Sequence, residues 1–577
     1  MPKSIDYAHI EPASADTGER DTSSAKSTDS AAANKRHHTV ENANEPQSND
    51  DDDDTNPVSR YIRQWVAEHR FLWHLFWWLL VTAYWVALLV VNHEGALITS
   101  LLWAFVTGLF FFAHVPTTIV TKPLCVVFDT LVTRPASRFS SRARLIGGAV
   151  LVVAIVVVVS MASPETELGK RPARLQSLFG ILVFGGLVWI SSVNRSAIKW
   201  RIPIVGLLLQ FLLGVFITKS KAGYDIFRWL ADQAATLLGY SSAGTTFVFG
   251  ETVAKSGVVA VSVFPPILFF STLINMLYYV SAIQWLITKF AWFMVRVMDT
   301  SGSESVVAAA SPFVGQGESA LLVQPFVEHL TDSEIHSVMT SGFSTIAGSV
   351  LGGYISMGVD AQVLITSCVM SVPCSLAMSK LRIPETKHSL TKGRVVIPKQ
   401  DRGEINILHS AGNGAAQGLK LVGLIMAALI AFTSLLALIN GLLGYFGGLL
   451  GKPDLTLEFI LRYPMIIFAW LVGVPGDDVL IVGELLGTKL VASEFLAYMK
   501  YSNKDHGYKP LLTKRGAKLT EYALAGFANF TSTGIQIGTL GAIAPTRKRD
   551  FARLVFSAML VGGLSTLTSA AIAGLLI

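Results

Sequence analysis

Two short polar segments interrupt long apolar stretches of this chain, and their side chains could do chemistry. The first is Gln316-Gly317-Glu318, where an amide and a carboxylate stand two residues apart around a glycine. The second centres on Glu494, a carboxylate among apolar neighbours, with Asn529 and Ser532 further along the chain. A carboxylate shielded from water accepts hydroxyl donors strongly, and an amide matches a fixed donor-and-acceptor edge. These residue types suit a ligand that carries hydroxyl groups and such an edge.

Each of these residues also has a purely structural interpretation. Glu318 and Glu494 could pair with lysine or the backbone, and Gln316 between two glycines could serve a turn. Asn529 begins a formal glycosylation sequon, and Ser532 could bond a carbonyl of its own helix. Carboxylates at membrane depth are costly and are usually retained for function, which favours the functional interpretation.

The apolar stretches around these residues have the length of membrane-spanning helices. Hydrophobic residues make up 51% of the 577, charged residues only 15%, and the mean hydropathy is +0.50. Runs of roughly 17–25 apolar residues predict transmembrane helices. We therefore expect an all-α polytopic membrane protein with about eleven spans and two further segments that do not cross simply. The runs are Phe71–Val91, Ala96–Phe112, Ile146–Met161, Leu178–Val193, Ile204–Ile217, Val258–Val280, Gly342–Met357, Ala361–Ala377, Leu419–Leu443, Tyr522–Ile543 and Leu554–Ile577.

Charge, cysteines and the N-terminal segment restrict the remaining classes. Basic residues gather in short loops between spans, which is a topology signal, so we expect no nucleic-acid partner. They place the N-terminus in the cytosol and the C-terminus outside, with two basic stretches in disagreement, Lys170–Arg174 and Lys500–Lys518. Residues 1–57 are polar and include Asp50–Asp54, which predicts a disordered acidic tail. The three cysteines predict no disulfide framework, and no motif indicates an enzyme or a cofactor.

Thr300–His329 is too broken to be an ordinary span. Its arms, Ser303–Ala310 and Ser319–Val327, are each about half of the length that crosses a bilayer. Between them, Pro312 and two glycines interrupt the helix. Non-helical backbone at this depth survives only where protein or a water-filled cavity satisfies it. We expect a re-entrant hairpin with its tip at a binding site; the alternative is a surface loop between two interfacial helices.

A second region repeats this organisation. Leu457–Tyr498 is too long for one crossing and is broken at Gly473–Asp478, which places Glu494 on its second arm. Each hairpin is followed by a span with a polar interruption, Ser344–Ser349 in the first case and Phe527–Gly534 in the second. A hairpin, a broken span and a plain span, given twice with opposite orientation, form the inverted-repeat plan of secondary transporters. Such transporters bind substrate at the repeat interface near the midplane.

Five ordered motifs resemble the concentrative nucleoside transporter family. The resemblance runs from about Leu178 to the C-terminus, and three extra N-terminal spans resemble eukaryotic members of fungal type. It implies nucleosides as partners, a homotrimer in the bilayer, and a transport domain that moves past a fixed scaffold. The motifs are Val314–Ser319, Gly342–Gly352, Ser493–Tyr498, Gly526–Asn529 and Ala544–Asp550.

The resemblance assigns a role to each candidate residue. It places Gln316 and Glu318 on the nucleobase, and Glu494 and Ser532 on the ribose hydroxyls. In the family, serine in place of Gly315 accompanies pyrimidine preference, so the glycine implies that purine nucleosides are accepted as well. Three further residues would stand beside the ribose or line the pocket: Asn529, Val350 and Phe527.

The expected cation site departs from the family pattern at two positions. Sodium-coupled members resemble Asn-Ile-Phe-Val-Gly-Gln-Thr-Glu at the hairpin tip, whereas this chain has Ser311 for the asparagine and Gly317 for the threonine. Sodium is a hard cation that must exchange its hydration shell for oxygen ligands. The two losses therefore favour a proton, with Glu318 as its carrier. The other positions that the resemblance assigns to the coupling ion are kept, namely Val314, Thr345 and Ile346.

Together these inferences predict a plasma-membrane symporter that imports nucleosides with a proton by alternating access, without a cofactor. Two alternatives stay open: the same fold coupled to sodium, and a receptor or channel without coupled transport. The predicted parts are 1–57, the cytosolic tail; 58–174, three N-terminal transmembrane helices; 175–300, scaffold helices with interfacial helices; 301–380, hairpin 1 and repeat 1; 381–456, a cytosolic loop and scaffold helix; and 457–577, hairpin 2 and repeat 2.

Overall fold

The structure is a computed structural model that describes residues 69–91, several positions between 99 and 110, and then 140–166, 168–254, 258–395, 403–503 and 507–577. The predicted tail at 1–57 and most of the predicted span Ala96–Phe112 lie outside the described residues. By its internal contacts the chain separates into two units, Met1–Leu131 and Val132–Ile577.

The first unit contains α2, Arg70–Val91, which matches the predicted first span. Two of its tryptophans bond to the segment that follows: Trp78 Nε1 donates to Thr107 Oγ1 at 3.0 Å and Trp85 Nε1 to Ser100 Oγ at 2.9 Å. The ring of Trp85 also stacks on Trp103 at 4.2 Å between centroids. These contacts satisfy the N–H of both indoles and cover one ring face with another aromatic ring.

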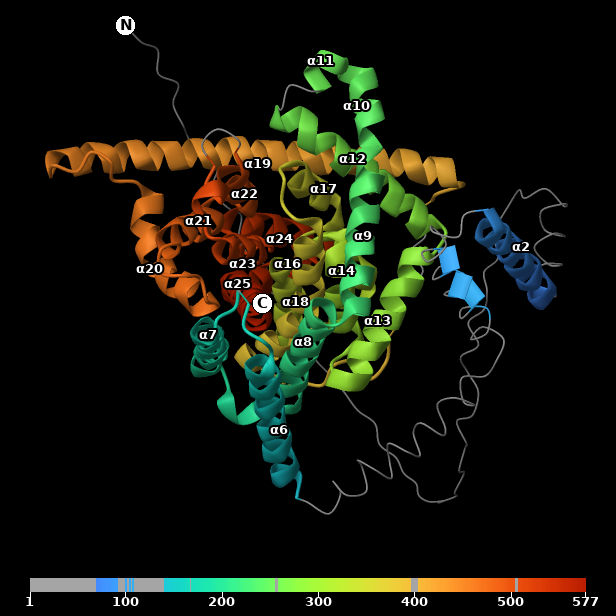
Figure 1. The fold of residues 1–577 in the computed structure, drawn as a ribbon, viewed down its shortest axis with the longest axis horizontal. Coiled ribbons are helices and arrows are strands. Elements are labelled where there is room, and N and C mark those ends of the chain that lie inside the picture. The colour runs from blue at the N-terminus through green and yellow to red at the C-terminus, as the bar shows by residue number, and fades with distance from the viewer. Residues whose placement is uncertain are drawn as a thin grey trace, which may run out of the picture. The chain divides into compact units, whose positions relative to one another are not determined.

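The described part of the second unit is helical, with two isolated β-bridges and no strand. This confirms the all-α fold class. The helices, shown in Figure 1, are α6 Ser141–Ala162, α7 Arg171–Ile190, α8 Arg201–Lys219, α9 Lys221–Gly239, α10 Ser241–Phe249, α11 Glu251–Ala254, α12 Val259–Tyr279, α13 Ala282–Met298, α14 Gly302–Val314, α15 Gln324–Val327, α16 Asp332–Ser344, α17 Gly348–Ser356, α18 Ala361–Arg382, α19 Ile407–Leu449, α20 Leu457–Val472, α21 Val479–Val491, α22 Glu494–Ser502, α23 Lys514–Leu524, α24 Phe530–Ile543 and α25 Lys548–Leu576. Short 3-10 turns are η2 Arg195–Ala197, η3 Glu318–Val323, η4 Lys509–Leu511 and η5 Pro545–Arg547.

Six helices among the described residues are long and apolar enough to cross a membrane, or seven if the bent pair α12–α13 counts as one span. The sequence predicts more for three reasons: most of Ala96–Phe112 lies outside the described residues, the apolar part of α6 is too short to be counted, and two apolar runs are not single helices. Gly342–Met357 is divided between α16 and α17, and Tyr522–Ile543 between α23 and α24. Extended backbone interrupts both runs, at Thr345 (φ −122°, ψ 163°) and at Asn529 (φ −149°, ψ 164°).

Two consecutive sets of helices follow one order. Each set starts with a helix of 21 or 43 residues, α12 or α19. Next come a second helix (α13 or α20), a hairpin arm (α14 or α21) and a short return segment (η3 or α22). The set ends with a helix pair broken in the middle (α16–α17 or α23–α24) and a last long helix (α18 or α25). Arm and return segment are in contact in each set. The described part of the second unit thus contains the repeated plan that the sequence predicts.

The second hairpin lies later in the chain than the sequence predicts. Leu457–Tyr498 contains α20, α21 and the start of α22, so the turn at Gly473–Asp478 joins α20 to α21. Its counterpart in the first set is the α13–α14 junction at 299–301. The counterpart of the first hairpin tip is instead the break at Ala492 and Ser493. Glu494 accordingly begins α22, the return segment of this hairpin, whereas the sequence predicts it within an arm that starts at the Gly473–Asp478 turn.

Local capping explains this second break. The Ser493 side chain accepts a hydrogen bond from the Leu496 backbone N–H at 3.2 Å, which satisfies a donor that the first turn of α22 leaves open. The serine itself is extended (φ −167°, ψ 160°), which stops α21 from continuing. An N-cap of this kind has a much weaker sequence signal than a Gly-Val-Pro-Gly turn.

The first hairpin turns at Gly315. α14 continues through Pro312 and ends at Val314, and Gly315 then has φ +101°, a value that favours glycine. At the other end of α14, Ser301 and Glu304 form a capping box. The buried Lys380 of α18 lies 2.7 Å from the same Glu304 carboxylate, which anchors the arm.

Long helices α12 and α19 cross closely, and α19 runs along one edge of the second unit in Figure 1. A Cβ on Gly414 would lie 2.8 Å from Thr272 Cα, so only glycine permits this approach. Ser271 Oγ donates to the Gly414 carbonyl at 3.0 Å, and Asn275 Nδ2 to Gln417 Oε1 at 3.2 Å. The helices α9 and α13, predicted to lie at the interface, both form, and α9 packs on α8 and α18.

Candidate ligand-binding site

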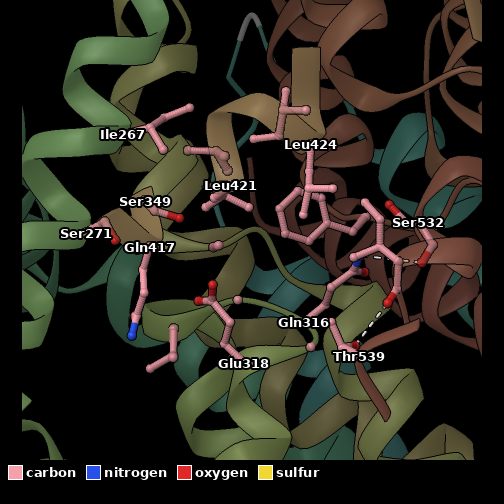
Figure 2. A pocket seen from close by; sticks show the side chains of 18 of the residues that line it. Ile267, Ser271, Gln316, Glu318, Ser349, Gln417, Leu421, Leu424, Ser532 and Thr539 are labelled. Carbon is pink, nitrogen blue, oxygen red and sulfur yellow. Dashed lines mark hydrogen bonds between the residues drawn. The ribbon is translucent and has the colours of Figure 1, made fainter. Parts of the chain in front are cut away.

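One cavity of about 590 Å³ lies where the two sets of helices meet (Figure 2). Its wall comes from the first hairpin tip, α12, α17, α19, the start of α22 and α24. All seven residues that the resemblance assigns to substrate line it: Gln316, Glu318, Val350, Glu494, Phe527, Asn529 and Ser532. Sequence positions up to 216 residues apart are thus brought together by the fold.

Glu494 is the best-supported polar group in this wall. It is 5% exposed; Tyr354 Oη donates to its Oε1 at 2.9 Å, and Asn529 Nδ2 donates to its Oε2 at 2.7 Å. The carboxylate also stands at the N-terminus of α22, where helix partial charge stabilises an anion. Each oxygen retains a lone pair, so the group is held in place and can still accept from a ligand.

Asn529 links this carboxylate to α24. It is the N-cap of that helix, and its Oδ1 accepts from the Ser532 backbone N–H at 2.7 Å while its Nδ2 reaches Glu494. The side chain is 1% exposed. Asn529 therefore uses both ends of its amide internally, and its role is to orient Glu494.

Gln316 and Glu318 stand at the hairpin tip in different environments. Gln316 is 7% exposed; its Nε2 donates a long bond of 3.5 Å to the Ser532 carbonyl, and its Oε1 has no hydrogen-bond partner. Glu318 is exposed to the cavity. This corrects the expectation that Glu318 is desolvated: it begins η3 on the open side of the tip, and Glu494 is the buried carboxylate of the two.

The residues expected to hold a coupling ion lie on elements that pack together. α14 contacts both α16 and α17, which bracket Thr345 and Ile346. Val314 lines the cavity, whereas Ser311, Thr345 and Ile346 are each 1% exposed and lie behind it. The hydroxyls of Ser311 and Thr345 donate to carbonyls of their own helices, to Val307 at 2.7 Å and to Ser341 at 3.1 Å. Their lone pairs remain available to a cation.

A buried ammonium lies behind the second break. Lys489, in the last turn of α21, is 5% exposed, and its Nζ donates to the Ala523 carbonyl near the end of α23 at 2.9 Å. It lines a second, mostly apolar cavity of about 260 Å³. Lys489 thus places a cation at the C-terminal end of α23, where one backbone carbonyl accepts from it.

Three family models match successive parts of the chain. "Na+ dependent nucleoside transporter N-terminus" covers residues 179–252, "Nucleoside recognition" covers 260–361, and "Na+ dependent nucleoside transporter C-terminus" covers 363–574. The chain is 36% identical to CNTnw, of which a variant solved in an outward-facing state is matched over 99% of its length and 70% of this chain, with a TM-score of 0.67. The inward-facing, substrate-bound structure of CNTnw matches with a TM-score of 0.65 over 98% of its length and 70% of this chain.

The chain belongs to the concentrative nucleoside transporter family. It is 42% identical over 422 residues to solute carrier family 28 member 3 of Eptatretus stoutii, and 40% identical over 421 residues to sodium/nucleoside cotransporter 1 of Mus musculus. Each alignment takes up 71% of this chain and 62% or 65% of the relative, so the chain spans less than two thirds of these curated relatives. The relatives are named as transporters, which confirms at family level that this is not an enzyme.

Several residues that line the cavity were not predicted from the sequence. Tyr354 holds Glu494 but looks like any aromatic residue of an apolar run. Gln417 and Lys420 face the cavity from α19. They could have been found as polar residues at helical spacing in a long apolar helix. Thr539 lines the cavity two turns beyond Ser532 on α24 and had no sequence signal at all.

Proposed function

We propose that this chain is a symporter that imports nucleosides together with a cation by alternating access. One observation carries the proposal: the Glu494 carboxylate, held by Tyr354 and Asn529, and the Gln316 side chain, whose amide oxygen has no partner among the described residues, line one cavity of about 590 Å³. That volume falls in the range of about 300–1,000 Å³ typical of small-molecule sites. The two groups suit the two halves of a nucleoside, whose sugar offers hydroxyl donors and whose base offers a polar edge.

In this proposal the sugar binds at the start of α22 and the base binds at the hairpin tip. Glu494 accepts from ribose hydroxyls, as a charged acceptor forms the stronger kind of hydrogen bond. Gln316 and Glu318 face the base, and Val350 and Phe527 supply apolar wall. A site that pairs hydroxyls in this way rejects an analogue lacking them far better than one that differs by a methylene. Deoxygenated sugars should therefore be poor substrates, whereas purine and pyrimidine bases both fit the proposal.

Two cations are candidates for coupling. The proton is favoured by the serine and glycine at positions 311 and 317, which remove oxygen ligands from the tip. Sodium is favoured by the names of the relatives and by the retained Val314, Thr345 and Ile346. The exposed Glu318 is accessible for loading from the cavity, as a proton carrier must be.

Tracer uptake into proteoliposomes or oocytes tests the proposal. Nucleoside should accumulate above its external concentration, because a coupled gradient of about 1.4 kcal/mol supports each tenfold of accumulation. Equilibration without accumulation would indicate a channel, and binding without uptake would indicate a receptor. Replacing sodium by choline at external pH of about 7.5 and about 5.5 separates the two cations. Proton coupling predicts uptake that rises on acidification and ignores sodium.

The assembly and location are part of the same proposal. We place the chain in the plasma membrane with a cytosolic N-terminus and an extracellular C-terminus, from the distribution of its basic loops. A homotrimer is proposed from family membership. Exposed apolar side chains on α9 and α10, among them Leu230 and Phe247, offer surface for a neighbouring copy or for lipid. Cross-linking in membranes distinguishes a trimer from a monomer.

A further inference from the structure

Gly317 at the hairpin tip is required for space and not for its backbone conformation. Its φ of −90° and ψ of −37° are open to any residue. A Cβ at this position, however, would lie 2.4 Å from Thr539 Oγ1 and 2.7 Å from Thr539 Cγ2. The Thr539 side chain therefore occupies the volume that a side chain at position 317 would need.

Thr539 brings a hydroxyl from α24 to the tip of the opposite repeat. It lines the main cavity, and Figure 2 shows it at the same end as Gln316. Its Oγ1 donates to the carbonyl oxygens of Ile535 at 3.0 Å and Gln536 at 3.2 Å. Since a hydroxyl has one proton, the oxygen can only accept from a ligand in the cavity.

A second oxygen atom at this end of the cavity could also accept a hydrogen bond from a ligand. Gln316 Oε1 has no partner although the residue is 7% exposed, and its Nε2 is directed to the Ser532 carbonyl. A buried carbonyl oxygen without a donor is costly unless a ligand supplies one. Two acceptors thus belong to residues that line this end of the cavity, which suits a ligand edge that presents N–H or O–H groups.

The position along α24 indicates which part of the ligand is involved. Thr539 follows Ser532 by seven residues, which is about 10 Å along a helix at ~1.5 Å per residue. The proposed ribose partner Glu494 contacts α24 at its N-cap, Asn529. Thr539 therefore stands at the far end of the cavity from the sugar, beside the base.

We propose that Thr539, whose side chain fills the space that Gly317 leaves free, is a specificity-determining residue whose hydroxyl oxygen accepts an N–H of the nucleobase. This deepens the proposed function and rests on it. The residue recognises the donor edge of a base, such as the ring imide N–H of uridine. It supplies from α24 a hydroxyl that the hairpin tip itself lacks.

The decisive variant is Thr539→Val, which keeps the shape and removes the acceptor. Uridine and 3-methyluridine, which lacks the imide N–H, are compared as inhibitors of labelled uridine uptake. One neutral hydrogen bond corresponds to about 2-fold to 13-fold in affinity. The inhibition constant of 3-methyluridine divided by that of uridine should fall by that factor in Thr539→Val, mainly because uridine binds less tightly. An unchanged ratio overturns the proposal.

A reciprocal exchange tests the steric part. Gly317→Thr should lose uptake by more than about 10-fold, since its side chain collides with Thr539. Adding Thr539→Ala makes room and returns a hydroxyl to the site, so the double variant should recover to within about 3-fold of the original. Gly538→Ala is the matched control, because nothing lies within 4 Å of its added Cβ.

Surface amount and elution as a folded protein in detergent are measured for each variant. A well-folded Gly317→Thr protein with normal uptake, or a folded double variant that stays inactive, overturns the proposal. Absence of nucleoside uptake in the unaltered chain would instead defeat the proposed function itself. The two failures are therefore distinguishable.

Discussion

The two halves of the second unit treat equivalent helix ends in different ways. In the later half, α21 and α23 end around the ammonium of Lys489, which donates to the Ala523 carbonyl. In the earlier half, α14 and α16 end around Ser311 and Thr345, whose hydroxyls bond to carbonyls of their own helices. The lysine of that half, Lys380, pairs with Glu304 at the opposite end of α14.

We propose that this difference decides which half takes a cation from solution. Carbonyl groups at helix C-termini carry partial negative charge that a cation stabilises. The later half has that cation covalently attached. The earlier half presents hydroxyl and carbonyl oxygens, with no Lys or Arg in an ion pair or hydrogen bond to Ser311 or Thr345 among the described residues. A mobile ion that binds there can couple to movement, whereas a fixed one can only stabilise structure.

The largest expected effect comes from the carboxylate that joins the later half to the cavity. Glu494→Gln should lower kcat/KM for every nucleoside by about 10-fold to 150-fold, the value of one charge-assisted hydrogen bond. All substrates should be affected alike, because each presents the same ribose. Initial rates of uridine and adenosine uptake measure this. Glu484→Gln, on α21 and bonded to Tyr508, is the control and should leave uptake near normal.

The stabilising role of the Lys489 ammonium can be tested directly by removing it. Replacing Lys489 by methionine leaves the Ala523 carbonyl at the end of α23 without its cation, which costs about 1–3 kcal/mol. Thermal unfolding in detergent should move to lower temperature, and adding sodium should not reverse the shift. Arg553→Met, which removes an exposed pair with Asp332, should change stability much less. Equal shifts in the two variants would mean that Lys489 has no special role.

The earlier half can be altered in the opposite sense. Ser311→Asn restores a longer oxygen ligand at the end of α14 and should create or strengthen sodium dependence of uptake, by about 10-fold in half-saturating sodium. Uptake at a series of sodium concentrations, with choline as replacement, measures it. Ser305→Asn, at the far end of the same arm, serves as comparison. If uptake depends on sodium neither in the unaltered chain nor in Ser311→Asn, the ion does not bind at this helix end.

The smallest effect is expected at the hairpin turn. Gly315→Ser places a side chain where φ is +101° and where the Ala347 Cβ lies 3.3 Å away from the new Cβ. The tip should shift toward the cavity and reduce purine uptake by about 3-fold relative to uridine, as expected for a strain near 1 kcal/mol. Competition of uridine uptake by adenosine and guanosine is the measurement. An unaltered purine-to-pyrimidine ratio would show that this glycine does not set the choice of base.

Much of the site was predictable because membrane burial makes polar residues conspicuous. Gln316, Glu494 and Asn529 stand out in apolar surroundings, and all three reach the same cavity. The first hairpin was predictable from Pro312 and Gly315, although the glycine alone makes the turn. What the pattern could not supply was position in space.

The errors have local physical causes. The strong turn signal at Gly473–Asp478 concealed the N-cap at Ser493, so Glu494 was assigned to the wrong element. Glu318 was taken as desolvated because its segment is apolar, yet it faces the open cavity. Tyr354 and Thr539 have ordinary types for their helices, and only packing between distant segments gives them a role.

The 43 residues of α19 extend about 65 Å at ~1.5 Å per residue. A bilayer core is only about 30 Å thick, so the helix must lie at a shallow slant or project well beyond the lipid. Because a helix keeps its length, α19 would respond to a change in lipid thickness by changing its tilt. α19 packs most closely on α12 at Gly414, and both helices contribute to the cavity wall. We therefore expect lipid chain length to affect the tilt of α19 and, through this crossing, the width of the cavity.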